Sequence, residues 1–369
     1  MGSMLHLLLP TPPLVGSSTM TFTLRDDLGQ IPPYVPGKRA PEAVKLSSNE
    51  VQLPPLPAAV AAMADAAATA NRYPDMSVHE LKHELANHLH IDAAQVTCGC
   101  GSSALCQQLV QATCRPGEEV IFPWRSFEAY PIFAMVTGAT PVPVPLTDSH
   151  HVDLVAMAQA ITDQTRLIFV CNPNNPTGTT VTKQAFAEFM AAVGSNIVVA
   201  LDEAYFEYVR DDDTPNAAEL LAVYPNLVGL RTFSKAYGLA GVRVGYAFGH
   251  AEIIAAVERC ALPFGVSGVA QAGALASLAA QHELLARTDV TVRVRDTFQT
   301  AVGAVPSQAN FVWIPTPDAV DIAAHLAARG VLVRAFPEGI RITVTDEREM
   351  DVALQALQAV IEDTGALQQ

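Results

Sequence analysis

The stretch VVALDEAY, residues 198–205, is an apolar run that ends at two carboxylates, Asp202 and Glu203. A short, continuously apolar run is typical of a strand that is buried on both faces of a sheet. A similar run covers residues 166–171, and residues 183–193 between the two have a helical pattern. Strand, helix and strand in this order predict two parallel strands joined by a helix, and therefore an α/β fold.

The same alternation extends over most of the chain. Further strands are predicted at residues 95–98, 119–122, 140–144, 226–231 and 244–248. Helices are predicted at residues 56–70, 77–89 (with Ser77 as N-cap), 103–114, 127–136, 153–160, 252–261 and 268–287. Beyond about residue 290 the pattern becomes α+β, with strands at 311–314, 331–334 and 339–344 and a final helix. We therefore expect a mostly parallel sheet in a large domain plus a smaller α+β domain.

Four segments follow from this pattern. Residues 1–19 contain a short apolar run broken by prolines, and we interpret them as a leader or cloning extension, with Met20 as the natural start. Residues 20–45 are irregular and proline-rich, and are expected to form an arm that packs on the small domain. Residues 46–265 would form the large domain, and residues 266–369 the small C-terminal domain.

Charge and cysteine usage exclude several classes of protein. The net charge is −15 and no basic block is present, which argues against nucleic acid or an anionic membrane as a general partner. No apolar run reaches the length of a membrane span. The six cysteines lack the paired spacing of a metal site, and scattered cysteines are common in reduced proteins. We expect a cytoplasmic protein without a metal ion.

One lysine has surroundings that suit a reactive amine. In RTFSKAYGLAGVR, residues 231–243, Lys235 follows a predicted strand, with hydroxyl side chains before it and Arg243 eight residues later. A lysine with a lowered pKa forms an imine with an aldehyde, while hydroxyls and a guanidinium bind phosphate. The alternative is an ordinary solvated lysine on the surface.

Two further segments lie at the ends of predicted strands. CNPNNPTG, residues 171–178, is a turn dense in amide side chains, although turn formers alone would explain its composition. Asp202 lies at the carboxyl end of its strand, where ligands of open α/β sheets bind. A carboxylate there can pair with a protonated pyridine nitrogen, whereas the alternative is a helix N-cap.

Together, NNPTG (174–178), DEAY (202–205) and SKAYG (234–238) resemble the fold-type-I aminotransferases, which depend on pyridoxal 5'-phosphate (PLP), and within them the histidinol-phosphate and aromatic branch. The motifs occur in the family's order and at similar separations, and the resemblance extends from about Tyr34 to Thr343. It implies an aspartate aminotransferase-like fold whose large domain binds PLP. It also implies an enzyme that is a homodimer with shared active sites.

The resemblance assigns roles in cofactor binding. Lys235 would form the internal aldimine and carry the proton between Cα and the cofactor. Asp202 would bind the pyridinium nitrogen, while Asn175 and Tyr205 would bind the phenolic oxygen. Phe127 would stack on the ring, unless it is a core residue at a helix start.

The phosphate and the substrate also acquire expected partners. The phosphate would lie at the turn GCGSS (99–103), which is a weak signal by itself. Its partners would be Gly101, Ser102, Ser103, Thr232, Ser234 and Arg243, with Tyr73 from the neighbouring subunit. Substrate would be bound by Tyr34, Asn49, Arg334 and Arg341, with Arg341 clamping the carboxylate. The loop departs from the family pattern after Glu50, where VQLP replaces an immediate Asn-Pro.

The substrate is inferred from finer similarities. PWRSFE (123–128) and SQANFVW (307–313) resemble actinobacterial phenylalanine or aromatic aminotransferases. Together with Glu128 and the apolar Val35, Phe264 and Phe336, they favour ping-pong transfer between phenylalanine or tyrosine and a keto acid such as 2-oxoglutarate. The alternative is a histidinol-phosphate aminotransferase, which needs extra donors for a second phosphate. PLP-dependent decarboxylation or lysis is a third possibility, and a PLP-sensing regulator would need a DNA-binding module that the pattern lacks.

Overall fold

The computed structural model describes residues 25–34, 37, 40 and 42–366. The expected extension at 1–19, the start at Met20 and the expected pocket residue Val35 lie outside the described residues. Contacts divide the chain into two units, Met1–Pro32 and Pro33–Gln369. The described part of the first unit, residues 25–32, contains one short 3-10 helix, Asp26–Gln30, and the following paragraphs concern the second unit.

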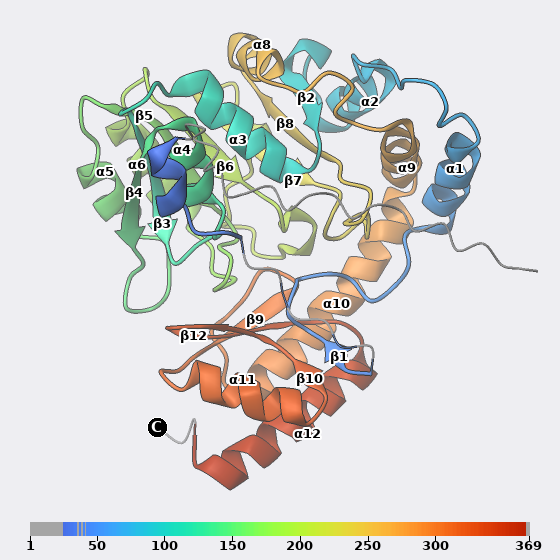
Figure 1. Ribbon diagram of the computed structural model, residues 1–369, viewed down its shortest axis with the longest axis vertical. Helices are drawn as coiled ribbons and strands as arrows, with labels where there is room; N and C mark the ends of the chain where they lie inside the picture. Colours follow the sequence, from blue (N-terminus) through green and yellow to red (C-terminus); the bar gives the residue numbers. More distant parts are fainter. Residues whose placement is uncertain (1–24, 35–36, 38–39, 41, 367–369) are drawn as a thin grey trace, which may run out of the picture. The chain divides into compact units, whose positions relative to one another are not determined.

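A seven-stranded sheet is the centre of this unit (Figure 1). In spatial order its strands are β2 (Val96–Gly99), β8 (Gly245–Gly249), β7 (Leu227–Thr232), β6 (Val198–Asp202), β5 (Thr165–Cys171), β3 (Glu119–Trp124) and β4 (Thr140–Pro145). Neighbouring strands are parallel except that β8 is antiparallel to both β2 and β7. The connection from β7 to β8 contains no helix, so the chain turns back beside β7. The expected mostly parallel sheet is confirmed.

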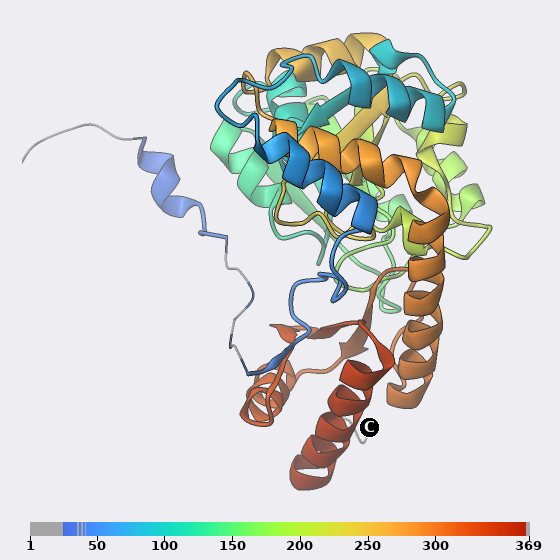
Figure 2. The same ribbon diagram turned by 90° about the vertical axis from the view of Figure 1, so that its right-hand side faces the viewer.

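Helices cover both faces of this sheet. On one face lie α3 (Ser102–Thr113), α4 (Tyr130–Thr137) and α8 (Ala251–Arg259). On the other lie α1 (Pro57–Ala67), α2 (His79–Leu89), α5 (Leu154–Gln159), α6 (Lys183–Ala192) and α9 (Gly268–Ala279), with α1 and α9 side by side (Figure 2). Alternate residues of β5 point to opposite faces, with Phe169 in the first cluster and Ile168 in the second. Burial on both faces explains the continuously apolar strands.

A second, smaller sheet is antiparallel. Its strands, in spatial order, are β11 (Arg334–Phe336), β12 (Gly339–Thr343) and β9 (Phe311–Pro315). Around it pack α10 (Gln281–Val302), α11 (Ala319–Ala328) and α12 (Glu347–Thr364), with a hydrophobic cluster of their own. β1 (Val44–Lys45) pairs in parallel with β10 (Val331–Leu332). The remaining short elements are α7 (Ala217–Leu220) and two 3-10 turns, Ala93–Gln95 and Phe206–Tyr208.

Several local expectations are wrong. Ser77 does not cap α2, because Asp75 accepts hydrogen bonds from the backbone N–H groups of Ser77 (2.9 Å) and His79 (2.7 Å), and Val78 precedes the helix. The helix expected at 268–287 is interrupted at Ala280, and α10 then continues to Val302. The strand expected at 331–334 divides between β10 and β11, and these pair with different strands.

The helix expected at 127–136 begins only at Tyr130. The sequence interpretation also missed α11, although its buried Ala319, Ile322 and Leu326 have helical spacing.

Candidate active site

A cavity of about 500 Å³ lies at the carboxyl ends of β5, β6 and β7, and side chains of β11 and β12 complete its wall. Most of the residues expected at the site line this one cavity. They are Tyr34, Asn49, Ser102, Ser103, Phe127, Asn175, Asp202, Tyr205, Thr232, Ser234, Lys235, Arg243, Arg334 and Arg341.

Lys235 lies in the loop that follows β7. Its Nζ donates to the Ser48 carbonyl at 3.5 Å and lies 5.8 Å from the centre of the Tyr205 ring. Burial lowers the pKa of Lys235 to about 8, and the positive charges of Arg341 and Arg243 act in the same direction. A lowered pKa leaves more of the amine unprotonated near neutral pH, which is the form that attacks an aldehyde.

Asp202 ends β6 with one carboxylate oxygen satisfied and the other open. Oδ2 accepts a hydrogen bond from the Tyr130 hydroxyl at 2.6 Å. Oδ1 is buried and has no partner among the described residues. Burial raises the pKa of Asp202 to about 6. A buried carboxylate oxygen calls for a donor, and the protonated nitrogen of a PLP ring meets that requirement.

An anion cradle is built where α3 begins. Gly101 precedes the helix with φ 77°, and a Cβ at this position would lie 2.4 Å from Arg243 Nη2. Arg243 Nη1 donates to the Ser234 hydroxyl at 3.3 Å, and the backbone N–H of Ser234 donates to the Thr232 hydroxyl at 3.1 Å. A helix N-terminus beside a guanidinium and hydroxyls suits a phosphate. These residues therefore fit PLP at its phosphate end, as Asp202 does at its nitrogen.

Arg341, on β12, lines the same cavity. Its Nη1 donates to Asn175 Oδ1 at 2.5 Å and its Nη2 to the Ser47 carbonyl at 2.7 Å. Its Nε is buried without a partner among the residues that the structure describes. Burial lowers the pKa of Arg341. Because no carboxylate of the described chain pairs with it, this guanidinium can bind a substrate carboxylate.

Asn49 is fixed despite the unusual sequence that follows it. Its backbone N–H donates to Thr343 Oγ1 at 2.9 Å, and that hydroxyl donates to Asn49 Oδ1 at 3.1 Å. Its Nδ2 donates to the Tyr205 hydroxyl at 2.9 Å. Burial raises the pKa of Tyr205. Glu50, the point of departure from the family pattern, forms an ion pair with Lys45 and also lines the cavity.

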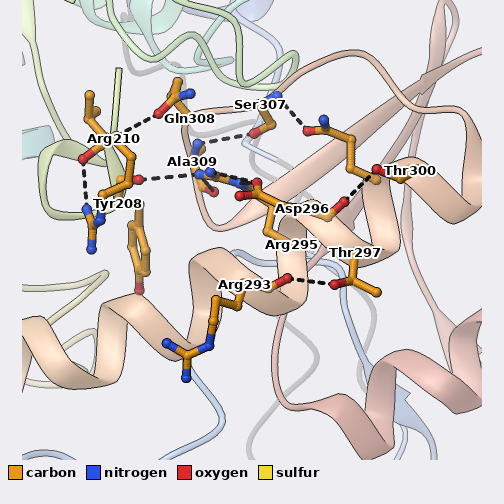
Figure 3. Close-up of polar contacts among 12 residues, drawn as sticks. Tyr208, Arg210, Arg293, Arg295, Asp296, Thr297, Thr300, Ser307, Gln308 and Ala309 are labelled. Atoms are coloured by element: carbon orange, nitrogen blue, oxygen red, sulfur yellow. Dashed lines mark hydrogen bonds and ion pairs between the residues drawn. The ribbon is translucent and has the colours of Figure 1, made fainter. Parts of the chain in front are cut away.

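The segment that leads into β9 is bonded to α10 and to residues 208–210 (Figure 3). The same segment also anchors the amide-rich turn. The backbone N–H of Gln308 donates to the Gly178 carbonyl at 2.8 Å. Gly178 has φ 74°, and a Cβ there would lie 2.1 Å from Ser307 Oγ. Buried Arg295 of α10 donates to the carbonyls of Tyr208 (3.3 Å) and Ala309 (3.2 Å). Because a Cβ at Gly178 would overlap the Ser307 side chain, close packing requires the glycine of NNPTG.

Three expected residues do not line the cavity. Gly101, which has no Cβ, leaves room for the Arg243 guanidinium of the cradle. Tyr73 is 82% exposed and stacks on Phe264, with ring centroids 4.6 Å apart. Phe264, expected near the substrate ring, is likewise absent from the lining, whereas Phe336 belongs to it.

The sequence interpretation missed other residues of the site. Tyr130, the partner of Asp202, follows Phe127 by three residues, and their rings meet edge-on at 5.4 Å. The available signal was their three-residue spacing within the helix expected at 127–136, although that helix begins only at Tyr130. Ile132 and Phe133 add apolar lining.

In the described part of the chain no helix is long and apolar enough to cross a membrane, and no cluster of three or more potential ligands could hold a metal ion.

Comparisons with known proteins agree with this geometry. The family model for aminotransferases of class I and II matches residues 41–357. The chain is 64% identical over 342 residues to the aromatic amino acid aminotransferase of Corynebacterium diphtheriae, covering 91% of this chain and 99% of that protein.

Solved structures show the same fold. The histidinol-phosphate aminotransferase of Sinorhizobium meliloti, in complex with PLP, matches with a TM-score of 0.80 at 29% identity, over 87% of this chain and 91% of that one. A double mutant of the Thermus thermophilus aspartate aminotransferase matches with a TM-score of 0.77 at 23% identity, over 86% of this chain and 92% of that one. The expected aspartate aminotransferase-like fold is confirmed.

Proposed function

This chain belongs to the class I and II aminotransferases, which are PLP-dependent enzymes, and on that premise we propose that it transfers an amino group between phenylalanine or tyrosine and a 2-keto acid such as 2-oxoglutarate. Lys235 would carry the cofactor. The observation that supports this best is the pairing of a lysine of lowered pKa with a buried, half-satisfied Asp202 in one cavity. The relatives at high identity are aromatic amino acid aminotransferases.

Different residues of the cavity would bind the substrate and the cofactor. Arg341 would hold the substrate carboxylate, with its free Nε adding a second donor. The N-terminus of α3, with Ser102, Ser103 and Arg243, would hold the cofactor phosphate. Held by these residues, the reactants would be aligned before reaction, which removes much of the entropic barrier.

Bound PLP supplies an electron sink for the negative charge that develops at the substrate Cα. Asp202 would keep a proton on the ring nitrogen, since its open oxygen calls for a cationic donor. The Lys235 amine would take the proton from Cα and deliver it to the other reacting carbon. Asn175 and Tyr205 would orient the phenolic oxygen, and Phe127 would stack on the ring. Water would supply the carbonyl oxygen of the product keto acid, while the amino group would stay with the cofactor. A second keto acid would take up that amino group in the reverse sequence, with release of water.

The apolar lining favours an aromatic side chain. Phe127, Ile132, Phe133 and Phe336 all line the cavity. A histidinol-phosphate aminotransferase remains the second candidate, because a structural relative has that name. That substrate would need unpaired cationic donors for its phosphate, and Arg334, which lines the same cavity, is already paired with Glu128 at 2.7 Å.

We also propose a cytoplasmic homodimer with shared active sites, in which Tyr73 reaches the phosphate bound to the neighbouring subunit. The exposed Tyr73–Phe264 stack supports this, because exposed aromatic residues are enriched at interfaces. The division into an arm (20–45), a large domain (46–265) and a small domain (266–369) is part of the same proposal. The separate hydrophobic cluster of the small sheet supports two domains, although α9, within 266–369, packs on the large sheet.

The test is a visible spectrum of the PLP-loaded protein before and after addition of phenylalanine. Loss of the band of the lysine-bound cofactor and appearance of the amine form would support both the cofactor and the reaction. A protein that stays colourless with excess PLP would overturn the proposal. Competing rates with phenylpyruvate and histidinol phosphate would then separate the two substrates, and a strong preference for the phosphate ester would overturn the aromatic assignment.

A further inference from the structure

Two ion pairs join the segment 125–128 to the β11–β12 hairpin. Arg334 Nη2 donates to Glu128 Oε2 at 2.7 Å. Arg125 donates to both carboxylate oxygens of Glu338, at 2.9 and 3.1 Å. The pairs connect the same two segments, but only Glu128 and Arg334 line the cavity. They differ, therefore, in whether a substrate can reach them.

The two guanidiniums that β11 and β12 contribute to the cavity have different partners. Arg341 binds an amide oxygen and a backbone carbonyl, whereas Arg334 binds a carboxylate. Both flank the Phe336 ring, with their Cζ atoms 5.7 and 5.6 Å from its centre. Arg334 and Arg341 are also direct partners across β11 and β12, so a second anionic group of a molecule held by its carboxylate at Arg341 can reach Arg334.

We infer that Glu128 is a specificity-determining residue, because its carboxylate competes with any second anionic group of a substrate for Arg334. An uncharged side chain leaves the Glu128–Arg334 pair intact. A dicarboxylate or a phosphorylated substrate must displace Glu128 before its own anion can bind. This inference rests on the proposed function, in which the same cavity binds the amino acid and the keto acid.

The competition is partial, which lets the enzyme accept both kinds of substrate. The Glu128 side chain is 32% exposed, so a displaced carboxylate can turn towards water. The Arg334 side chain is 17% exposed, so it gains more from a direct anionic partner. Removing the charge of Glu128 should strengthen binding of a second anion by about tenfold, near the lower end for a hydrogen bond to a charged group.

The test compares Glu128→Gln with the matched control Glu338→Gln in PLP-loaded enzyme. Binding of ligands that lack an amine is measured by titration: glutarate and 3-phosphonopropionate, which carry a second anion, against 3-phenylpropionate, which does not. In Glu128→Gln the ratio of dissociation constants should shift about tenfold towards the doubly charged ligands. In Glu338→Gln it should stay within about twofold, since an exposed pair contributes little. The carboxylate and phosphonate arms show whether both anions use Arg334.

Arg334→Gln provides a second measurement. It should weaken binding of glutarate more than binding of 3-phenylpropionate. The double variant Glu128→Gln/Arg334→Gln should lose the stronger binding of doubly charged ligands that Glu128→Gln shows alone. An unchanged ratio in Glu128→Gln, or an equal shift in Glu338→Gln, overturns the inference. Failure of the proposed function is visible separately, because the unaltered enzyme would then not react with phenylalanine.

Discussion

Asp202 and Glu203 are neighbours in sequence and both are buried, yet their surroundings differ. Glu203 accepts from Arg231 Nε at 2.9 Å and from the backbone N–H of Ala217 at 2.8 Å, so both of its oxygens are bonded. Asp202 has one bonded oxygen and one without a partner in the described structure. Glu203 belongs to the framework under the cavity, and Asp202 to the cavity itself. The satisfied carboxylate serves stability, and the unsatisfied one indicates a ligand.

The largest effect expected on the cavity side is that of Lys235→Ala. Under the proposed mechanism, losing the amine removes both the covalent attachment and the proton carrier, so kcat should fall at least about 10³-fold. The folded protein should keep its thermal midpoint, because the substitution removes a desolvated amine from the cavity. Single-turnover kinetics measure the loss of activity, and thermal unfolding measures the stability. Borohydride reduction of the unaltered enzyme should label Lys235, and a label on another lysine would contradict this assignment.

Glu203→Gln tests the framework side. It leaves the Arg231 guanidinium buried without a charge partner, and breaking a buried ion pair costs about 3–5 kcal/mol. The measurement is urea unfolding of the PLP-loaded enzyme. The molecules that remain folded should keep the pH profile of kcat/KM of the unaltered enzyme, because Glu203 lies outside the cavity lining. An altered pH profile of kcat/KM with unchanged stability would contradict the assignment of Glu203 to the framework.

Asp202→Asn should have the opposite signature, with activity lost and stability spared. Burial raises the folded-state pKa of Asp202 to about 6, above its ordinary value near 4. The folded cofactor-free protein thus binds the proton more tightly, and its stability should fall as pH rises from about 4 to 6, by roughly 2–3 kcal/mol. Urea unfolding across this window should show less fall in Asp202→Asn. An identical pH dependence of stability in Asp202→Asn and in the unaltered protein would contradict the raised pKa of Asp202.

The same contrast explains what the sequence could predict. The apolar strands and the three motifs are local patterns, so they indicated the sheet and most of the cavity lining. The interruption at Ala280 and the division of 331–334 into β10 and β11 depend on partners distant in sequence. The Glu128–Arg334 pair likewise joins residues 206 positions apart, and neither residue alone signals it. The role proposed for Tyr73 rests on the proposed neighbouring subunit, which a single chain does not contain.

The smallest expected effect concerns Tyr130, which connects the aromatic wall to Asp202. Tyr130→Phe removes the 2.6 Å hydrogen bond to Oδ2, and that bond favours the charged carboxylate. Stability should change by about 1 kcal/mol and kcat by less than about tenfold. The acidic limb of the kcat/KM profile should move to higher pH, because the carboxylate becomes harder to ionise.

Tyr237→Phe is the matched control for Tyr130→Phe. Its hydroxyl is buried and accepts from Gln281 Nε2 at 3.1 Å, outside the cavity lining. Losing this bond should lower stability by a similar amount and leave the acidic limb in place. A merely structural role of Tyr130 would make the two variants alike. A shifted limb in Tyr130→Phe alone would instead mean that Tyr130 acts through Asp202, the unsatisfied carboxylate of the pair.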